Sequence, residues 1–397
     1  MKLCIYCKGG RNLCKLGYCP LIARKKEIKI GEDFFGKSPS VFVGRFGYPD
    51  VFAGPLGLAG SNDDAVSIDN PASWFVSPYQ EIIESRSFLL RTRKKQNIFS
   101  KERFALQLQE IALAAKPADT EMHFSKKPRI SMNFSDMMQP FGPTATIEKM
   151  RIAENVKIER SVEKIASDDL KASQAGNMLY EDGQDVYKIT TILSSGALGM
   201  KKKLVPTRWS ITATDDMIFK SLIKRVKEYK IINGYLVFSS QYLDNHFEIL
   251  LMPGSWQYEG FEAWSPGSYW TKGLKEIEIV EEYEPYEGRK AYAEKQAGGY
   301  YAARIGVAEG LCALRKQASA IIFREIYEGY TIPLGVWVVR ETVRNAFKQK
   351  PLKFDSLEDA LAHIGKKLRV PIGEYRKRSS ILRQSRLDSF KNFANNS

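Results

Sequence analysis

The chain has 397 residues, of which 44% are hydrophobic and 12% aromatic, the composition of a folded globular protein and not of a disordered one. Its 60 Lys and Arg residues against 46 Asp and Glu residues give a formal net charge of +14, and the basic residues are clustered, which favours nucleic acid as a partner over a merely solvated basic surface. No apolar run approaches the ~18 residues that cross a bilayer, and no apolar segment follows Met1. We therefore expect a soluble, cytoplasmic protein that associates with the nucleoid and not with a membrane.

Four of the five cysteines lie close together near the N-terminus: Cys4, Cys7, Cys14 and Cys19. Four thiolates at this spacing can surround one tetrahedral zinc ion, and such a closed site serves folding and not catalysis. The alternative is two disulfides, but nothing in the sequence points to an oxidising compartment. The spacing therefore predicts a Cys4 zinc knuckle over residues 1–25, with Zn²⁺ as a structural ion.

The first half of the chain predicts alternating strands and helices. Residues 28–36 are expected to form a linker. Residues 40–55 contain a short β run interrupted by closely spaced glycines, which predicts a strand, a loop and a second strand. Residues 100–115 are expected to form a helix, and residues 147–170, which are rich in alternating Lys and Glu, are expected to form another.

The second half begins with a predicted helix over 215–229, which carries acidic residues in its first turn. Two strands are expected over 235–238 and 247–252, on either side of a loop. Glycines open a long predicted helix over 302–327, whose apolar positions mark a core face. The remaining expected elements are a strand over 333–339, a helix from Glu341, a helix over 356–368 and a basic tail from residue 375.

Together these elements predict a mixed α/β (α+β) fold. We expect a main domain over 30–290, built on a large mixed sheet, and a helical C-terminal part over 291–372 that packs on it. The zinc knuckle precedes these parts, and a flexible basic tail over 375–397 follows them.

The densest polar segment contains six candidate site residues: Lys203, Thr207, Arg208, Ser210, Asp215 and Asp216. The guanidinium of Arg208 offers a bidentate fork for phosphate. Adjacent aspartates suit a hard cation such as Mg²⁺, so Asp215 and Asp216 are candidate catalytic residues. In the alternative interpretation, the acidic residues only cap a helix.

Other candidate residues lie elsewhere in the chain. Arg45 is expected to hold phosphate, Asn245 to contact the nucleotide or DNA, and His246 to act as nucleophile or general acid. Backbone N–H groups at a helix start favour anions, so a nucleotide-binding or DNA-binding site is also expected at the four residues Gly298, Gly299, Tyr300 and Arg304. The alternative for each is an ordinary helix cap or a core side chain.

The C-terminal tail has Gln384, Leu387 and Phe390 at the spacing of the box by which DNA enzymes dock on the sliding clamp (PCNA). One 3₁₀-like turn places the two apolar side chains on one side, although a random polar tail also matches this pattern fairly often. The sequence lacks the Gly-x4-Gly-Lys-Ser/Thr motif of P-loop NTPases and the Lys-x-Asp-Gly motif of ordinary DNA ligases.

Several segments together resemble the archaeal Nre (NreA-type) DNA repair proteins. They are the cysteine knuckle, Gly44–Pro49, Asp69-Asn-Pro71, Pro140-Phe-Gly-Pro143, Leu204–Asp216, Gly298–Arg304 and Pro333–Trp337. The resemblance implies a DNA repair protein that binds the sliding clamp through its C-terminus. It also implies enzymes that join single-stranded DNA ends, with ADP-ribose as the source of adenylate.

Our hypothesis is therefore a clamp-recruited enzyme that acts on single-stranded DNA ends by nucleotidyl transfer, with Mg²⁺ and ADP-ribose as candidate cofactors. One alternative is a non-catalytic adaptor that binds DNA and the clamp. Another is a nuclease that uses the same carboxylates with metal ions.

Overall fold

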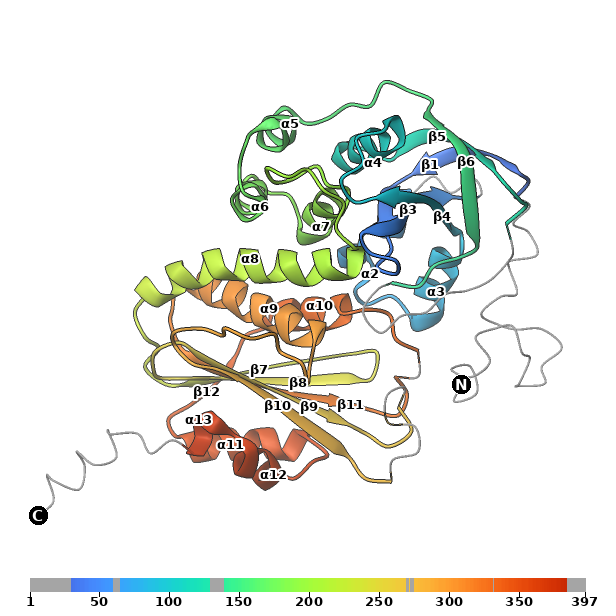
Figure 1. The fold of residues 1–397 in the computed structure, drawn as a ribbon. Coiled ribbons are helices and arrows are strands. Elements are labelled where there is room, and N and C mark those ends of the chain that lie inside the picture. The colour runs from blue at the N-terminus through green and yellow to red at the C-terminus, as the bar shows by residue number, and fades with distance from the viewer. Residues whose placement is uncertain are drawn as a thin grey trace, which may run out of the picture. The chain divides into compact units, whose positions relative to one another are not determined.

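The computed structural model describes residues 30–59, 65–128, 139–268, 271, 275–330 and 332–383 (Figure 1). These residues form two compact units. The first lies within Met1–Ser221 and Thr331–Glu341, and the second lies within Leu222–Tyr330 and Thr342–Ser397. The boundary that we predicted near residue 290 falls inside the second unit, and the predicted zinc knuckle and clamp-binding box lie outside the described residues.

Each unit is built on a six-stranded mixed sheet with helices, which confirms the mixed α/β class. The described residues thus form two sheets where the sequence led us to expect one large mixed sheet. In the part of the chain that the structure describes, no helix is both long enough and apolar enough to cross a membrane.

The sheet of the first unit has the order β1-β5-β6-β4-β3-β2. Its strands are β1 (Asp33–Ser38), β2 (Ser40–Val43), β3 (Asp50–Leu58), β4 (Leu89–Asn97), β5 (Ala118–Phe124) and β6 (Thr144–Ile152). Only β4 and β6 run parallel, and the other neighbours are antiparallel. The register of β3 with β4 sets Phe52 opposite Lys95, and the alternation of side chains leaves Phe52 exposed while Val51 is buried.

The helices of the first unit are η2 (Ser67–Asp69), α2 (Pro71–Trp74), α3 (Tyr79–Ser87), α4 (Arg103–Leu113), α5 (Arg160–Ser167), α6 (Ala172–Glu181) and α7 (Val186–Ser194). Helix α4 places Phe104, Leu108 and Ile111 in the core of this sheet, as their helical spacing predicts. Asp185 caps α7, because its side chain accepts a hydrogen bond from the backbone N–H of Lys188 at 2.7 Å. Helices α8 (Thr207–Glu228) and α10 (Trp337–Lys348) contribute residues to both units.

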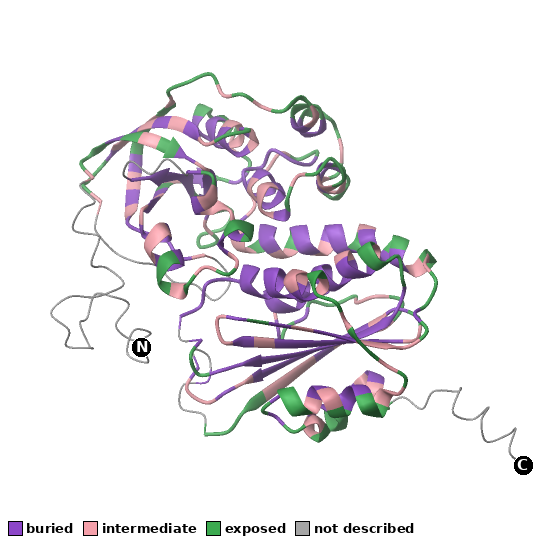
Figure 2. Cartoon of the chain, turned by 180° about the vertical axis from the view of Figure 1, so that it is seen from behind, coloured by how far each residue is buried: buried purple, intermediate pink, exposed green. Residues whose placement is uncertain are grey.

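The sheet of the second unit has the order β10-β9-β11-β8-β7-β12. Its strands are β7 (Tyr235–Tyr242), β8 (Asn245–Met252), β9 (Gln257–Trp264), β10 (Glu278–Glu284), β11 (Ser319–Ile326) and β12 (Leu352–Phe354). All eight residues of β11 are buried. In Figure 2, the central strands of this sheet are mainly purple, the colour of buried residues. Figure 1 shows one face of this sheet covered by α9 (Gly298–Leu314) and the other by α11 (Leu357–Lys367), α12 (Ile372–Arg378) and α13 (Ser380–Arg383).

Several predicted elements are confirmed, although their ends differ. The strand–loop–strand over 40–55 is β2 and β3, the helix over 100–115 is α4, and the strands around residue 244 are β7 and β8. The helix predicted over 215–229 begins earlier, at Thr207, and the helix over 356–368 is α11. Helical structure also extends into the predicted tail, where Tyr375 and Ile381 are buried.

Other predicted elements are wrong. The expected linker over 28–36 contains the start of β1, and the expected helix over 147–170 is strand β6 followed by the shorter helix α5. The expected helix over 302–327 ends at Leu314, where Arg315 adopts a left-handed conformation, and β11 follows. A fully buried strand has no alternation of apolar and polar residues, so periodicity cannot separate it from a buried helix. The expected strand over 333–339 is irregular until α10 begins at Trp337.

Candidate functional site

A pocket of about 260 Å³ lies in the first unit. Strands β2 and β3 contribute to its walls, together with α3 and the N-terminal parts of α5, α7, α8 and α10. The segments before α2 and β6 and the connection from α4 to β5 complete the walls. The charged groups that line it are Asp69, Arg86, Lys116, Glu159, Asp185, Lys188 and Arg340, and its aromatic groups are Phe42, Phe141, Tyr187 and Trp337. This volume is close to about 300 Å³, the lower end of the range of volumes of small-molecule binding pockets.

Arg86 of α3 fixes one wall of the pocket. Its side chain is fully buried, donates from Nε to the carbonyl oxygen of Pro140 at 3.0 Å, and donates from Nη1 to the carbonyl oxygen of Ile68 at 2.9 Å. Nη1 also pairs with one carboxylate oxygen of Asp69, and the other oxygen accepts a hydrogen bond from the hydroxyl of Ser40. Burial lowers the pKa of Arg86, and the charge of Asp69 opposes that shift. These contacts hold the Asp69 carboxylate at the pocket wall.

Lys188 lies in the first turn of α7 and also lines the pocket. Its Nζ donates a hydrogen bond to the carbonyl oxygen of Ala114 at 2.5 Å. Burial lowers the pKa of Lys188 to about 8, although Asp185 and Glu159 act in the opposite direction. A fraction of this amine is therefore unprotonated near neutral pH, the state in which lysine acts as a nucleophile or a base.

Arg340 reaches the pocket from α10 and is held there by Asp215 of α8. Arg340 donates to the two carboxylate oxygens of Asp215, from Nε at 3.0 Å and from Nη2 at 2.5 Å. Its guanidinium also lies 5.1 Å from the centre of the Tyr187 ring. A magnesium ion at Asp215 would have to compete with this arginine.

Thr207 is the one predicted site residue, among those that the structure describes, that lines the pocket. Its hydroxyl accepts a hydrogen bond from the backbone N–H of Val43 at 2.9 Å, which ties the start of α8 to β2. Nearby in the sequence, Ser210 is buried and donates to the carbonyl oxygen of Val205, while Asp216 pairs with Lys220.

The other cationic candidates of the first unit lie outside the pocket lining. Arg45 is exposed, and its guanidinium lies 4.9 Å from the centre of the Phe46 ring. Lys203 and Arg208 are partly exposed, on either side of the start of α8.

Asn245 and His246 lie in the second unit, at the start of β8. The side-chain oxygen of Asn245 accepts hydrogen bonds from Arg324 at 3.1 and 2.6 Å. His246 has a contact for each ring nitrogen, Nδ1 with the hydroxyl of Tyr327 at 3.1 Å and Nε2 with Glu248 at 2.7 Å. The structure thus gives both residues partners within the chain.

The expected anion site at Gly298, Gly299, Tyr300 and Arg304 is at the start of α9 in the second unit. Tyr300 donates to Glu284 at 3.0 Å, and Arg304 pairs with the same carboxylate. A Cβ at Gly299 would lie 2.7 Å from a carboxylate oxygen of Glu262. Carboxylates of the chain itself therefore surround the place where we expected a ligand anion.

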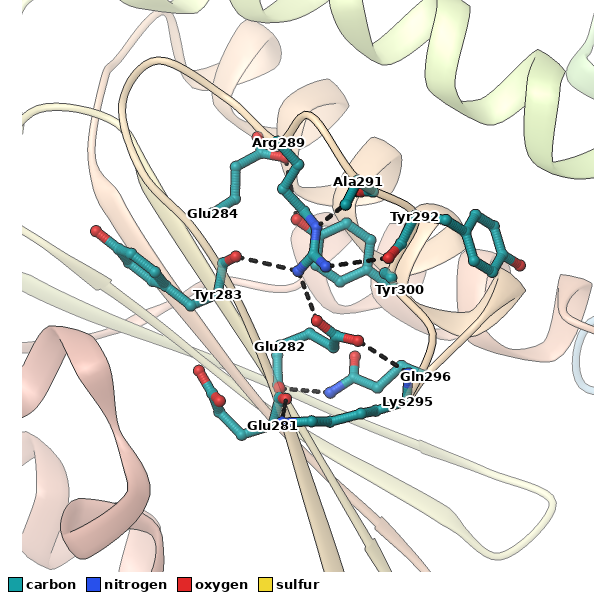
Figure 3. A network of polar contacts seen from close by, with 12 residues as sticks. Glu281, Glu282, Tyr283, Glu284, Arg289, Ala291, Tyr292, Lys295, Gln296 and Tyr300 are labelled. Carbon is teal, nitrogen blue, oxygen red and sulfur yellow. Dashed lines mark hydrogen bonds and ion pairs between the residues drawn. The ribbon is translucent and has the colours of Figure 1, made fainter.

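A neighbouring loop is fixed by Arg289, as Figure 3 shows. Its Nη1 donates to Glu282 at 2.6 Å and to the carbonyl oxygen of Tyr283 at 3.1 Å, and its Nη2 donates to the carbonyl oxygen of Tyr292 at 3.3 Å. The guanidinium lies 5.0 Å from the centre of the Tyr300 ring. The guanidinium of Arg289 is thus hydrogen-bonded within the chain, and these bonds hold the loop in place.

Sequence reasoning missed Ser40, Asp69, Arg86, Lys188 and Arg340 as pocket residues. A signal was present, because four of the segments that carried the family resemblance supply pocket residues. These residues are Asp69 and Asn70, Phe141, Thr207 and Ile211, and Trp337.

Comparison with known proteins covers almost the whole chain. The model described as "Archaeal Nre, N-terminal" matches residues 13–271, and the model described as "Archaeal Nre, C-terminal" matches residues 284–393. The chain belongs to the archaeal Nre family. The resemblance found in the sequence is thereby confirmed.

Three relatives are named DNA repair proteins. NreA of Archaeoglobus fulgidus is 40% identical over 98% of this chain and 99% of its own length. NreB of the same organism is 37% identical over 96% of this chain and 97% of its own length. NreA of Haloferax volcanii is 34% identical over 92% of this chain and 90% of its own length. No solved structure matches this Nre-family chain.

Proposed function

We propose that this chain is a DNA repair enzyme that joins single-stranded DNA ends by nucleotidyl transfer, with the nucleotide in the pocket of the first unit. The observation that carries the proposal is the lining of that pocket, which combines aromatic rings with the cations Arg86, Lys116, Lys188 and Arg340. Aromatic rings stack on bases, and cations bind phosphates. The repair role is supported by the names of the three relatives.

An exposed surface of the first unit fits the DNA strand. We define this stacking surface by its six side chains: Arg45, Phe46, Tyr48, Phe52, Arg93 and Trp209. The four aromatic side chains are all at least 40% exposed, and Phe46 reaches 78%. The guanidinium of Arg93 lies 5.3 Å from the centre of the Phe52 ring. The ring centres of Tyr48 and Trp209 are 5.2 Å apart. Exposed rings with arginines beside them are typical of surfaces that stack the bases of a single strand and bind its phosphates.

The stacking surface is connected to the pocket through the end of β2. The backbone N–H of Gly44 donates to the carbonyl oxygen of Phe52 at 2.8 Å, and the next residue back, Val43, binds the hydroxyl of the pocket residue Thr207. Trp209 follows Thr207 in the first turn of α8. A single DNA strand that is bound to the stacking surface would therefore bring its end to the pocket. Lys203 and Arg208 would then bind its phosphates.

The pocket residues fit ADP-ribose as the nucleotide, because they include buried arginine N–H groups beside aromatic rings. ADP-ribose would supply a phosphoanhydride bond. Lys188 and Arg340 would neutralise the charge that develops on the transferred group, the role that usually contributes most in transfer chemistry of this type. Mg²⁺ is a further part of the proposal, with Asp216 as the more exposed of the two expected ligands.

Recruitment by the sliding clamp and the structural Zn²⁺ also belong to the proposal, and they depend on residues outside the described ranges. Truncation before Gln384 should abolish binding to the clamp in a pull-down and leave end joining without the clamp unchanged. Retained clamp binding would contradict this part of the proposal.

The decisive test is to incubate the protein with 5′-phosphorylated single-stranded DNA and Mg²⁺, with ATP, NAD or ADP-ribose, and to read the products on a denaturing gel. We expect longer or circular DNA with ADP-ribose, strongly reduced in Lys188→Met. Lys37→Met, which removes an exposed lysine from β1, is the matched control. No product with any nucleotide would favour the adaptor, and shortened DNA would favour the nuclease.

A further inference from the structure

Lys188 differs from the two arginines of the pocket in the group that holds it. Arg86 and Arg340 are each paired with an aspartate. Lys188 forms no ion pair among the residues that the structure describes, and its Nζ donates instead to the neutral carbonyl oxygen of Ala114 at 2.5 Å. A carboxylate partner favours the charged form of a cation, and Lys188 lacks this stabilisation.

The amine of Lys188 lies at the surface of the pocket and not behind its wall. Lys188 and Ala114 both line the pocket, and Lys188 is only partly buried. The hydrogen bond between them therefore lies at the pocket wall, within reach of a bound molecule. In the neutral amine this bond uses one N–H group, so the lone pair of the nitrogen is left for an atom of the ligand.

The surroundings of this amine suit a nucleophile. Because burial lowers the pKa of Lys188 to about 8, roughly a tenth of the amine is unprotonated at pH 7. The charges of Asp185 and Glu159 act on the amine, and both residues line the pocket. Glu159 is held by a hydrogen bond from Gln184 at 2.9 Å. Carboxylates are therefore available to accept a proton from the nitrogen.

Two other cations of the pocket remain for the oxygens of a phosphate. Lys116 lies in the connection from α4 to β5, two residues after Ala114, and Arg340 enters from α10. A phosphoryl group under attack develops negative charge on its oxygens, and fixed cations stabilise that charge. The pocket thus combines a nucleophile with groups that neutralise the transferred phosphate.

We propose that Lys188 is the nucleophile of the nucleotidyl transfer and carries AMP on its Nζ between the two halves of the reaction. The proposal rests on the proposed function, with ADP-ribose as the substrate. Lys188 is outside any Lys-x-Asp-Gly motif, which ordinary DNA ligases have and this sequence lacks. It lies instead in the first turn of α7.

Lys188 acts in two steps. First, the lone pair of Nζ attacks the phosphorus atom of ADP-ribose that bears the adenosine. A phosphorus–nitrogen bond forms, the bond from this phosphorus to the bridging oxygen breaks, and its electron pair leaves with ribose 5-phosphate. The nitrogen gives a proton to a neighbouring carboxylate. Second, an oxygen of the DNA 5′-phosphate attacks the same phosphorus atom, and Nζ leaves with the electron pair of the phosphorus–nitrogen bond and takes up a proton. The 3′-hydroxyl of the other DNA end then displaces AMP and loses its proton to solvent.

The competing explanation is that Lys188 supplies only positive charge, while the DNA phosphate attacks ADP-ribose directly. In that case AMP is never bonded to the protein. An arginine separates the two explanations, because it keeps the positive charge but is not deprotonated in proteins and so has no free lone pair.

The test is to incubate the full chain with ADP-ribose and Mg²⁺ without DNA, and to measure the intact mass and the modified peptide by mass spectrometry. Lys188→Arg keeps a charged donor for Ala114 but removes the nucleophile. Lys37→Arg is the matched control, because Lys37 is an exposed lysine of β1 that pairs with Asp119. Calorimetric titration with ADP-ribose and a thermal melt show whether each variant binds the nucleotide and is folded.

We expect the wild type and Lys37→Arg to gain the mass of one AMP group, at Lys188, in a bond that acid breaks. Lys188→Arg should still bind ADP-ribose but form no adduct. In the wild type, the initial rate of adduct formation should rise about tenfold from pH 6 to pH 7, because the unprotonated fraction of an amine with this pKa rises by that factor.

Several results would overturn the inference. If the wild type joins DNA with ADP-ribose but forms no adduct, the covalent step is wrong while the proposed function stands. An adduct on another residue excludes Lys188, whether or not Lys188→Arg folds. An adduct with the mass of the whole ADP-ribose would show that the amine reacts with the aldehyde form of the terminal ribose and not with phosphorus. If the wild type neither binds ADP-ribose nor joins DNA with it, the proposed function fails, and this inference fails with it.

Discussion

Arg340 holds both carboxylate oxygens of Asp215, and the two side chains are at most 2% exposed. The aspartate that the sequence marked as a magnesium ligand is thus the partner of a pocket arginine. Removing one member of a buried ion pair leaves the other charge uncompensated, which usually costs more than the pair itself contributes.

Asp215→Asn should lower the free energy of unfolding by about 3–5 kcal/mol, because it removes the carboxylate from buried Arg340. Urea denaturation measures this loss. Asp216→Asn is the matched control, since Asp216 forms a partly exposed ion pair with Lys220, and we expect it to change stability by at most about 0.5 kcal/mol. Equal stability of the two variants would contradict the structural role of Asp215.

Trp209→Ala and Phe46→Ala should each weaken binding of a single-stranded oligonucleotide roughly five- to 150-fold, since stacking contributes about 1–3 kcal/mol per base. Fluorescence anisotropy with a labelled oligonucleotide measures the affinity at a fixed salt concentration. Phe35→Ala is the control, because Phe35 of β1 is 69% exposed but lies beside Glu121 and His123, away from the stacking surface. If Phe35→Ala weakens binding as much as the other two, the stacking surface is wrongly placed.

The junction of α12 and α13 should respond to pH through Glu259 of β9. This buried carboxylate accepts hydrogen bonds from the hydroxyl of Ser379 and the backbone N–H of Ser380. Burial, together with a hydrogen bond to Glu281, raises the pKa of Glu259 to about 7. The folded state therefore holds this proton more tightly than the unfolded state, and the contribution of Glu259 to stability falls as the pH rises from about 4.5 to 7.

Glu259→Gln removes this titration and keeps an oxygen that accepts hydrogen bonds from the junction. Between pH 5 and pH 8, the unfolding free energy of the wild type should decrease relative to that of Glu259→Gln, as urea denaturation at both pH values measures. A constant difference between the two proteins would show that Glu259 does not titrate in this range.

The N-terminal cysteines should bind one zinc ion per chain, and Cys4→Ser with Cys7→Ser should abolish that binding. Elemental analysis of the purified protein measures the metal content. Cys312→Ser is the control, because Cys312 is a partly buried free cysteine in α9. A zinc-free protein with two disulfides, detected by mass spectrometry, would establish the alternative.

Local patterns in the sequence were sufficient for several elements. Closely spaced glycines marked the turn between β2 and β3, and the apolar spacing within 215–229 marked α8. The same reasoning failed at Ser319–Ile326, because a strand buried on both faces looks like a buried helix in a single sequence. It also failed at β6, where pairing with β4 and β5 outweighs the helix preference of a segment rich in Lys and Glu.

The sequence by itself determined the Nre family, the mixed α/β class and the elements with strong local periodicity. Only the tertiary structure decided which polar groups have partners. Asp215 and its arginine are 125 residues apart in the chain, and Lys188 of α7 is hydrogen-bonded to Ala114, which follows α4. Whether a charge is compensated depends on side chains that only the folded chain brings together, and no local spacing encodes that.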